Sequence, residues 1–445
     1  MKKLLQYLGN YKKESILGPL FKLLEASFEL IVPLVMAAII DTGVANADRP
    51  YIMKMSLVLF LLALIGLTCA ITAQYFAAKA AVGCATGLRH ALFEHIETLS
   101  FTEMDTVGTS TLITRMTSDV NQVQNGVNLV LRLFLRSPFI VFGAMVMAFT
   151  IDVKAALVFV VTIPLLSVVV FGIMLVSIPL YKKVQAALDK VLGITRENLT
   201  GSRVIRAFNK EQDEIAQFHE DNEALTKIQL YVGKISALMN PLTYIIINGA
   251  IVVLVWVGAI RVDNGNITQG QVVALVSYMS QILVELIKLA NLIININKSI
   301  ACMNRIETVL DMESSITEHP AAETGSLTLD GAGREGKETI PAENAVVFSK
   351  VGLTYAGASE EALSDIDFTV RRGETIGIIG GTGSGKSSVV NLIPRFYDAT
   401  RGEVLVDGKN VRDYTLEELR AKVGVVLQKA VLFKGTCLLY TSPSP

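Results

Sequence analysis

Long apolar stretches alternate with polar segments along the first two thirds of the chain. Six apolar stretches follow one another, at residues 16–40, 55–78, 133–150, 155–180, 235–260 and 272–296. The second, fourth and fifth contain no Asp, Glu, Lys or Arg over 24, 26 and 26 residues, respectively. Because about 20 apolar residues cross a bilayer as a helix, the pattern predicts six transmembrane helices.

The polar segments between these stretches alternate in length, which indicates the topology. Residues 41–54, 151–154 and 261–271 are short segments, whereas 79–132 and 181–234 are 54 residues long each and carry many Lys and Arg. Cytoplasmic segments of membrane proteins carry the excess of Lys and Arg. We therefore expect a multi-pass protein of the cell membrane, with both long segments and both termini in the cytoplasm.

The two long segments have the pattern of helices rather than of loops. They contain no Pro, and helical periodicity continues through them. We predict that each projects from the membrane as a pair of helices joined by a short crosswise turn, at residues 101–112 and 197–208. Gly108 and Gly201 are placed to interrupt the helix at these turns.

Several charged residues fall within or beside the apolar stretches. They are Glu25 and Glu29 in the first, Arg132 and Arg136 at the start of the third, and Glu285 and Lys288 in the sixth. Charges at membrane depth are costly and usually face a cavity or a partner. Two interpretations remain open: a substrate cavity lined by the carboxylates, or structural ion pairs and positions near the cytoplasmic interface.

The composition agrees with a membrane protein that has a soluble part attached. Of the 445 residues, 51% are hydrophobic and 18% are charged, and the mean hydropathy is +0.48. A soluble chain is usually about a quarter charged. The net charge of −1 gives no basic footprint for nucleic acid. The four Cys and four His are scattered, so their spacing indicates neither a metal site nor a disulfide framework.

The pattern changes after residue 300. Residues 301–344 are predicted to be a linker, because they become polar and rich in Gly, Glu, Ala and Thr. Strand patterns follow at 345–348, 366–370, 375–379, 402–408 and 423–427, and helices are expected from residue 388 and over 416–422. We expect 375–379 and 423–427 to be buried strands. The alternation predicts an α/β domain that begins at residue 345.

A glycine-rich loop follows the predicted strand 375–379. It consists of Gly380, Gly381, Thr382, Gly383, Ser384, Gly385, Lys386 and Ser387, and it fits the phosphate-loop pattern G-x-x-x-x-G-K-[ST]. Glycines let the loop curl so that successive N–H groups face phosphate oxygens, and the following helix adds its positive end. We expect Lys386 to reach the β- and γ-phosphates and the Ser387 hydroxyl to bind Mg²⁺. We also expect Ser388, the next residue, to be one of the residues that bind the cofactor.

Six apolar stretches followed by this loop resemble one half of an ABC exporter. In that family an aromatic residue upstream of the phosphate loop stacks on adenine, and Tyr355 stands in the matching place. A glutamine at the end of a later strand contacts Mg²⁺ and senses the membrane domain, and Gln428 matches it. The crosswise turns correspond to the family's coupling helices. The resemblance implies an α-helical membrane domain over 1–300 and an ABC nucleotide-binding domain that binds ATP and Mg²⁺.

Among the branches of the family, the sequence most resembles bacterial multidrug exporter half-transporters. The resemblance therefore implies a second half-transporter as partner, in a homodimer or a heterodimer, within a lipid bilayer. It also implies efflux of amphiphilic, drug-like or lipid-like substrates bound among the first, third and sixth spans. ATP binding would close the two nucleotide-binding domains, and the coupling turns would pass this movement to the spans.

The resemblance also implies motifs that the printed sequence does not contain. A signature loop, an Asp for Mg²⁺, a catalytic Glu and a switch His should follow Gln428, but the sequence ends at Pro445 and no His follows His319. Residues 437–445 do not continue the family pattern, so we expect 345–436 to be the N-terminal part of the domain and 437–445 to be a non-native tail. Strands beside the phosphate loop would then be missing, and an apolar face would be exposed.

Two alternatives to an exporter subunit also contain a phosphate loop and a membrane segment. The chain could be a nucleotide-binding membrane subunit without turnover, either the degenerate half of a heterodimer or a regulator. A Glu directly after the Mg²⁺-binding Asp would indicate catalysis, whereas Asp or Gln there would indicate a degenerate site. A P-loop enzyme merely anchored to the membrane is disfavoured, because six spans and two long helical extensions exceed what an anchor requires.

We predict that the 445-residue chain binds ATP without hydrolysing it, because no general base or switch His follows the phosphate loop in the printed sequence. The measurement is phosphate release by the purified chain with ATP and Mg²⁺. Vanadate-sensitive turnover would contradict the prediction.

Overall fold

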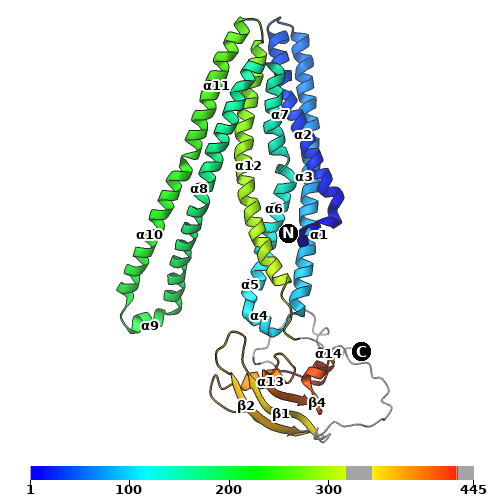
Figure 1. Cartoon of the computed structure of the whole chain (residues 1–445), viewed down its shortest axis with the longest axis vertical. Coiled ribbons are helices and arrows are strands. Elements are labelled where there is room, and N and C mark those ends of the chain that lie inside the picture. The colour runs from blue at the N-terminus through cyan, green and yellow to red at the C-terminus, as the bar shows by residue number, and fades with distance from the viewer. Residues whose placement is uncertain (1, 317–342, 427, 429–445) are drawn as a thin grey trace, which may run out of the picture. The chain divides into compact units, whose positions relative to one another are not determined.

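The structure is a computed structural model that describes residues 2–316, 343–426 and 428 (Figure 1). The chain forms two compact units. The first comprises Met1–Ala91 and Thr117–Glu307, and the second comprises Leu92–Met116 and Thr308–Pro445. The predicted crosswise turn at 101–112 thus belongs to the same unit as the phosphate loop. Each unit is described separately below.

Helices build the first unit, and two of them, α3 and α12, end within the second unit. They are α1 (Lys2–Leu8), α2 (Lys12–Ala38), α3 (Arg49–Thr98), α6 (Val120–Leu133), α7 (Arg136–Ile151), α8 (Val153–Thr200), α9 (Ser202–Ala207), α10 (Glu211–Ala237), α11 (Met239–Asp263) and α12 (Gln269–Leu310). Short 3-10 or π segments stand at Gly9–Tyr11, Ile39–Val44 and Arg115–Asp119. Six continuous helical stretches are long and apolar enough to span a membrane, which confirms the six predicted spans.

The predicted helical extensions and the second crosswise turn are confirmed in this unit. Helices α8 and α10 run side by side, and the short helix α9 crosses at their ends (Figure 1). Gly201 ends α8 and precedes α9. Helix α12 continues through Leu310, past the predicted start of the linker at residue 301. Residues 317–342 of that linker and the predicted tail 437–445 lie outside the described residues.

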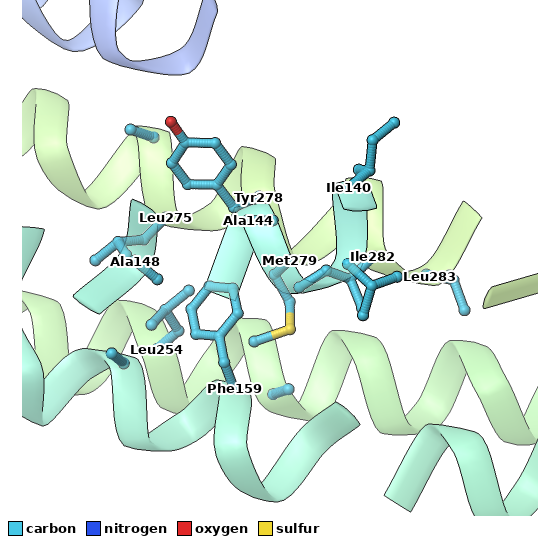
Figure 2. Close-up of a cluster of buried hydrophobic side chains, with 14 of the residues drawn as sticks. Ile140, Ala144, Ala148, Phe159, Leu254, Leu275, Tyr278, Met279, Ile282 and Leu283 are labelled. Carbon is cyan, nitrogen blue, oxygen red and sulfur yellow. The ribbon is translucent and has the colours of Figure 1, made fainter. Parts of the chain in front are cut away.

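The core of the first unit lies between α2, α7, α8, α11 and α12. Figure 2 shows the Phe159 ring on the same side as Met279, whereas the Tyr278 ring points away from both, and all three side chains are fully buried. The Tyr278 hydroxyl donates a hydrogen bond of 2.6 Å to the carbonyl of Leu30, so this polar group is satisfied in an apolar environment. Fully buried alanines, Ala144 among them, let the helices approach closely.

Two aspartates fix the ends of helices in this unit. Asp41 accepts hydrogen bonds from the Thr268 hydroxyl (2.5 Å) and the Gly270 amide (2.7 Å), which ties the end of the first span to the start of α12. Asp152 caps α8 through the Ala155 amide (2.8 Å) and pairs with Arg261. Burial alone would raise the pKa of Asp152, but hydrogen bonds from Arg261 and from backbone amides hold the pKa below its ordinary value.

The second unit contains a small antiparallel sheet. Its strands are β1 (Asn344–Leu353), β2 (Leu363–Arg371), β3 (Arg401–Val406) and β4 (Lys409–Asn410), in the order β2-β1-β3-β4. Helices α13 (Lys386–Leu392) and α14 (Leu416–Lys422) and a 3-10 turn (Val411–Asp413) complete the described part. Phe348 of β1 is fully buried and stacks on Phe368 at 4.6 Å. The predicted strands at 345–348, 366–370 and 402–408 are confirmed in position.

Two predicted buried strands are wrong. Residues 375–379 form no strand, and Ile379 is 96% exposed. Residues 423–426 form none either, and Val426 is 99% exposed, while residue 427 lies outside the described residues. An apolar run becomes a buried strand only when neighbouring strands take up its backbone hydrogen bonds, and the described residues provide no ladder partner. The apolar face that we expected to be exposed is formed by Ile376, Ile378 and Ile379.

The Gly270 contact generates a testable prediction. A Cβ at Gly270 would lie 2.4 Å from the Ala37 carbonyl oxygen and 2.7 Å from Asp41 Oδ2, so Gly270→Ala should force the helices apart and cost about 1–3 kcal/mol. We expect a lower midpoint of thermal unfolding for the purified chain in lipid nanodiscs. Gly249→Ala is the control, because nothing lies within 4 Å of a Cβ there. Equal midpoints for the two variants would contradict the prediction.

Candidate functional site

The predicted phosphate loop occupies an exposed turn directly before α13. Gly383 and Gly385 both have φ of +84°, a region that side chains disfavour, so glycine is required at these positions. A Cβ at Gly385 would also lie 2.5 Å from Leu363 Cδ2, whereas one at Gly381 or Gly383 would meet nothing within 4 Å. The loop backbone is therefore bent by two left-handed glycines and open to a ligand, which fits a phosphate group.

Lys386 lies over this loop. Its ammonium donates hydrogen bonds to the carbonyls of Gly380 (3.0 Å) and Gly381 (2.6 Å) and to the Ser384 hydroxyl (3.2 Å). The loop and Lys386 thus form one hydrogen-bonded unit, in which the ammonium group lies against the loop backbone. Ser387 is the next residue of α13 and is exposed, so its hydroxyl is accessible.

Tyr355 is brought to the start of α13 by the fold. Its hydroxyl lies 2.7 Å from the Ser388 hydroxyl, so the predicted adenine-stacking residue is joined to the residue that follows the loop. The Tyr355 ring also makes an edge contact with Tyr397 at 5.2 Å. Gln428 is exposed, and its side chain makes no hydrogen bond to the loop as far as the structure describes it. The structure thus groups Tyr355 and Ser388 with the loop, but not Gln428.

The first predicted crosswise turn is the short helix α4 (Phe101–Val107), and it packs beside this site. A capping box of Ser100 and Glu103 begins α4, and Gly108, with φ of +80°, ends it before α5 (Thr109–Thr114). Burial alone would raise the pKa of Glu103, but hydrogen bonds from Ser100 and Ser315 hold the pKa below its ordinary value. The predicted interruption of the helix at Gly108 is confirmed.

Helix α4 contacts the segment that follows α13 through aromatic rings and one hydrogen bond. The Phe101 ring lies 4.7 Å from that of Phe396 and 6.2 Å from that of Tyr397. The Tyr397 hydroxyl donates to Asp105 Oδ2 at 2.5 Å. Burial, followed by this hydrogen bond and the Asp105 charge, raises the pKa of Tyr397, so the hydroxyl stays protonated at neutral pH. One run of contacts therefore joins Tyr355 to α4.

The charged residues of the first unit form a network centred on Arg136. Its two terminal nitrogens donate to Glu285 Oε1 (2.7 Å) and to Glu29 Oε2 (2.6 Å). Glu285 also accepts from the Ser137 hydroxyl (2.8 Å) and from Lys288 (2.8 Å). The side chains of Arg136 and Glu285 are 8% and 4% exposed, so the network that links α2, α7 and α12 has a buried centre.

The other two candidates of the membrane half lie outside this network. Glu25 pairs with Lys22 at 2.6 Å on the same helix, which is the structural alternative raised by the sequence. Arg132 is half-buried, and the described residues offer no hydrogen-bond partner for its Nε. Glu25 and Glu29 lie one helical turn apart, as do Arg132 and Arg136, but only Glu29 and Arg136 form ion pairs of the network.

A pocket of about 260 Å³ opens beside the network. Its lining consists of Glu29, Ile140, Ser280, Gln281, Val284, Glu285 and Lys288. A second pocket, of about 370 Å³, lies between α11 and α12 and is lined mainly by valines and Ala259, with Asp263 and Gln269. The first pocket brings carboxylates and apolar side chains together, and both are features of a site for amphiphilic molecules.

Comparison with known proteins agrees with both halves of the chain. The family model of the ABC transporter transmembrane region matches residues 15–286, and a second model, described as ABC transporter, matches residues 363–439. The chain is 34% identical over 433 residues to an uncharacterized ABC transporter ATP-binding protein of Mycobacterium tuberculosis, covering 97% of this chain and 72% of that protein.

Two further relatives have names that state a function. A putative multidrug export ATP-binding/permease protein of Bacillus subtilis is 30% identical over 446 residues, covering 98% of this chain and 74% of the relative. An ATP-dependent lipid A-core flippase of Desulfotalea psychrophila is 30% identical over 345 residues, covering 78% of this chain and 58% of the relative.

Sequence reasoning missed several residues that the structure places at these sites. Tyr397 and Asp105 are far apart in sequence, and only the adjacent aromatic pair Phe396 and Tyr397 could have drawn attention to the contact. Gln281 was overlooked although it is a polar residue in an apolar span, four residues before Glu285. That spacing places Gln281 on the same helix face as Glu285.

The contact between α4 and Tyr397 generates a prediction. Tyr397→Phe keeps the ring but removes the hydrogen bond to Asp105, which should cost about 1 kcal/mol and speed amide exchange in α4 about fivefold. The measurement is hydrogen exchange of the purified chain, read by mass spectrometry on peptides covering 101–107. Tyr414→Phe is the matched control, because it removes a hydroxyl that donates to the Val406 carbonyl instead. Equal exchange of α4 in both variants would contradict the prediction.

Proposed function

Because the chain belongs to the ABC transporter family, as a half-transporter with six membrane helices and a cytoplasmic nucleotide-binding domain, we propose that it is a subunit of an ATP-driven exporter of amphiphilic, drug-like or lipid-like molecules. The observation that carries the proposal is the phosphate loop with Lys386 across it, on the same chain as a membrane domain with a polar pocket. Two relatives, one named a putative multidrug export protein and the other a lipid A-core flippase, support the substrate class.

The proposed roles follow from the geometry of the loop. The loop amides and Lys386 would hold the phosphates, Tyr355 and Ser388 would bind the adenosine side, and Ser387 and Gln428 would hold Mg²⁺. ATP supplies the free energy that moves the membrane helices. The chain's own contribution is to position a cation at the loop and to keep Tyr355 fixed against Ser388 and Tyr397.

The same contacts suggest how the nucleotide site acts on the rest of its unit. Tyr355 touches Tyr397, and Tyr397 touches both Phe101 and Asp105 of α4. A change in the position of Tyr355 would therefore reach α4 through packed rings and one charge-assisted hydrogen bond. We assign α4 the coupling role in this subunit, and a second half-transporter would provide the partner domain.

The nucleotide site can be tested on the 445-residue chain in lipid nanodiscs. We expect Lys386→Ala to weaken binding of a fluorescent ATP analogue at least tenfold, because the loop loses its charge-assisted contacts to phosphate. The measurement is a fluorescence titration with Mg²⁺. Lys422→Ala is the control, since Lys422 is exposed and pairs with Asp407 away from the loop. If Lys386→Ala binds the analogue as tightly as the control, the proposed site is wrong.

A further inference from the structure

The hydrogen-bond donors and acceptors around the pocket beside Arg136 determine which kind of ligand it can bind. Glu285 already accepts three hydrogen bonds, from Arg136 and Lys288 at Oε1 and from Ser137 at Oε2. Arg136 does not line the pocket, and both of its terminal nitrogens are held by carboxylates. The terminal nitrogens of Arg136 thus already face carboxylates, and its unpaired Nε is buried, so Arg136 offers little to an acceptor on a ligand in the pocket.

Two acceptors in the pocket remain available. Glu29 uses Oε2 for Arg136, and among the described residues no donor reaches its other oxygen; its side chain is 40% exposed. Gln281 Oε1 is buried and has no hydrogen-bond partner within the described part of the chain. An unsatisfied buried acceptor costs about 1–3 kcal/mol. A ligand with several N–H donors and a positive charge would satisfy both groups.

Lys288 sets the charge that such a ligand must carry. The network contains two carboxylates, Glu29 and Glu285, and two cations, Arg136 and Lys288, so it is neutral. Lys288 is the exposed member: its side chain is 43% exposed, whereas that of Arg136 is 8% exposed. The ammonium of a lysine is a point charge on a flexible stem, so it can turn towards water more easily than the doubly held Arg136. Once Lys288 turns away, the network carries one negative charge.

We propose that this pocket binds the primary ammonium group of a cationic amphiphile, which takes the place of the Lys288 ammonium and donates to Glu29 and Gln281. The inference rests on the proposed function and specifies its substrate class. Ile140 and Val284 line the same pocket, and Val284 is 48% exposed, so an apolar group attached to the ammonium has a surface to lie against. Glu285 keeps its bonds from Arg136 and Ser137 throughout.

Three fluorescent probes that share one apolar group test the proposal. They are dansylcadaverine, which carries a primary ammonium, its N-acetyl derivative, which is neutral, and dansyl-6-aminohexanoic acid, which is anionic. Each is titrated against the 445-residue chain in phosphatidylcholine nanodiscs, with empty nanodiscs subtracted. We expect the cationic probe to bind at least tenfold more tightly than the other two, because a charge-assisted hydrogen bond is worth about one to two powers of ten in affinity.

Amino-acid substitutions then test where the ammonium group of the probe binds. Glu29→Gln should weaken dansylcadaverine about tenfold, whereas Lys288→Met should strengthen it, because the competing internal cation is gone. The gain of affinity protects the test against a folding defect, which could only reduce binding. Glu25→Gln is the matched control: it removes a carboxylate one turn from Glu29 that pairs with Lys22 and does not line the pocket. It should leave the affinity for all three probes unchanged.

The possible failures are distinguishable. Equal binding of the three probes, or weaker cation binding by Lys288→Met, overturns the ammonium proposal and leaves the proposed binding of amphiphiles in place. An equal loss of affinity in Glu25→Gln and Glu29→Gln also overturns it, because the pocket carboxylate would then have no special role. If no probe binds while the ATP analogue still does, both the ammonium proposal and the proposed substrate class are wrong.

Discussion

A charge within the hydrocarbon region is stable only when another charge and several hydrogen bonds replace the water that it has lost. Arg136 meets this requirement with two carboxylates from two other helices, Glu29 and Glu285. Removing one partner from such a pair typically costs about 3–5 kcal/mol. The network therefore holds α2, α7 and α12 in one arrangement, and the fully buried contacts around Tyr278 and Met279 pack against these same helices.

In the second unit the same requirement applies to the backbone, because a buried N–H or C=O group needs a hydrogen-bond partner. Strand β1 pairs with both β2 and β3, and Phe348 of β1 is buried in the cluster that the strands form with α13 and α14. Residues 375–379 are equally apolar, but the described residues provide no ladder partner and the segment stays exposed. The phosphate loop nevertheless keeps its bend, because two glycines at positive φ and the hydrogen bonds of Lys386 determine it locally.

This difference between local and non-local causes separates what the sequence could predict from what it could not. The six spans, the crosswise turn at 101–112 and the phosphate loop were predictable, because apolar length, glycine position and a spaced motif are local properties. The contact of Tyr397 with Asp105 and the pairing of Arg136 with Glu29 and Glu285 depend on how distant segments pack, and no periodicity encodes that. The strand predicted at 375–379 failed for the same reason: burial of a strand is decided by its neighbours.

The charge balance of the membrane network also constrains how an exporter could use it. A neutral network of two carboxylates, one fixed guanidinium and one flexible ammonium has a single member that can leave without exposing Arg136, namely Lys288. An incoming cation keeps the network neutral, whereas a neutral molecule that displaced Lys288 would leave an uncompensated carboxylate, which is costly at this depth. Release of the cation on the other side requires Lys288 to return to Glu285. The lysine would thus favour release as well as select the charge, because its return to Glu285 restores the positive charge that the ligand had supplied to the network.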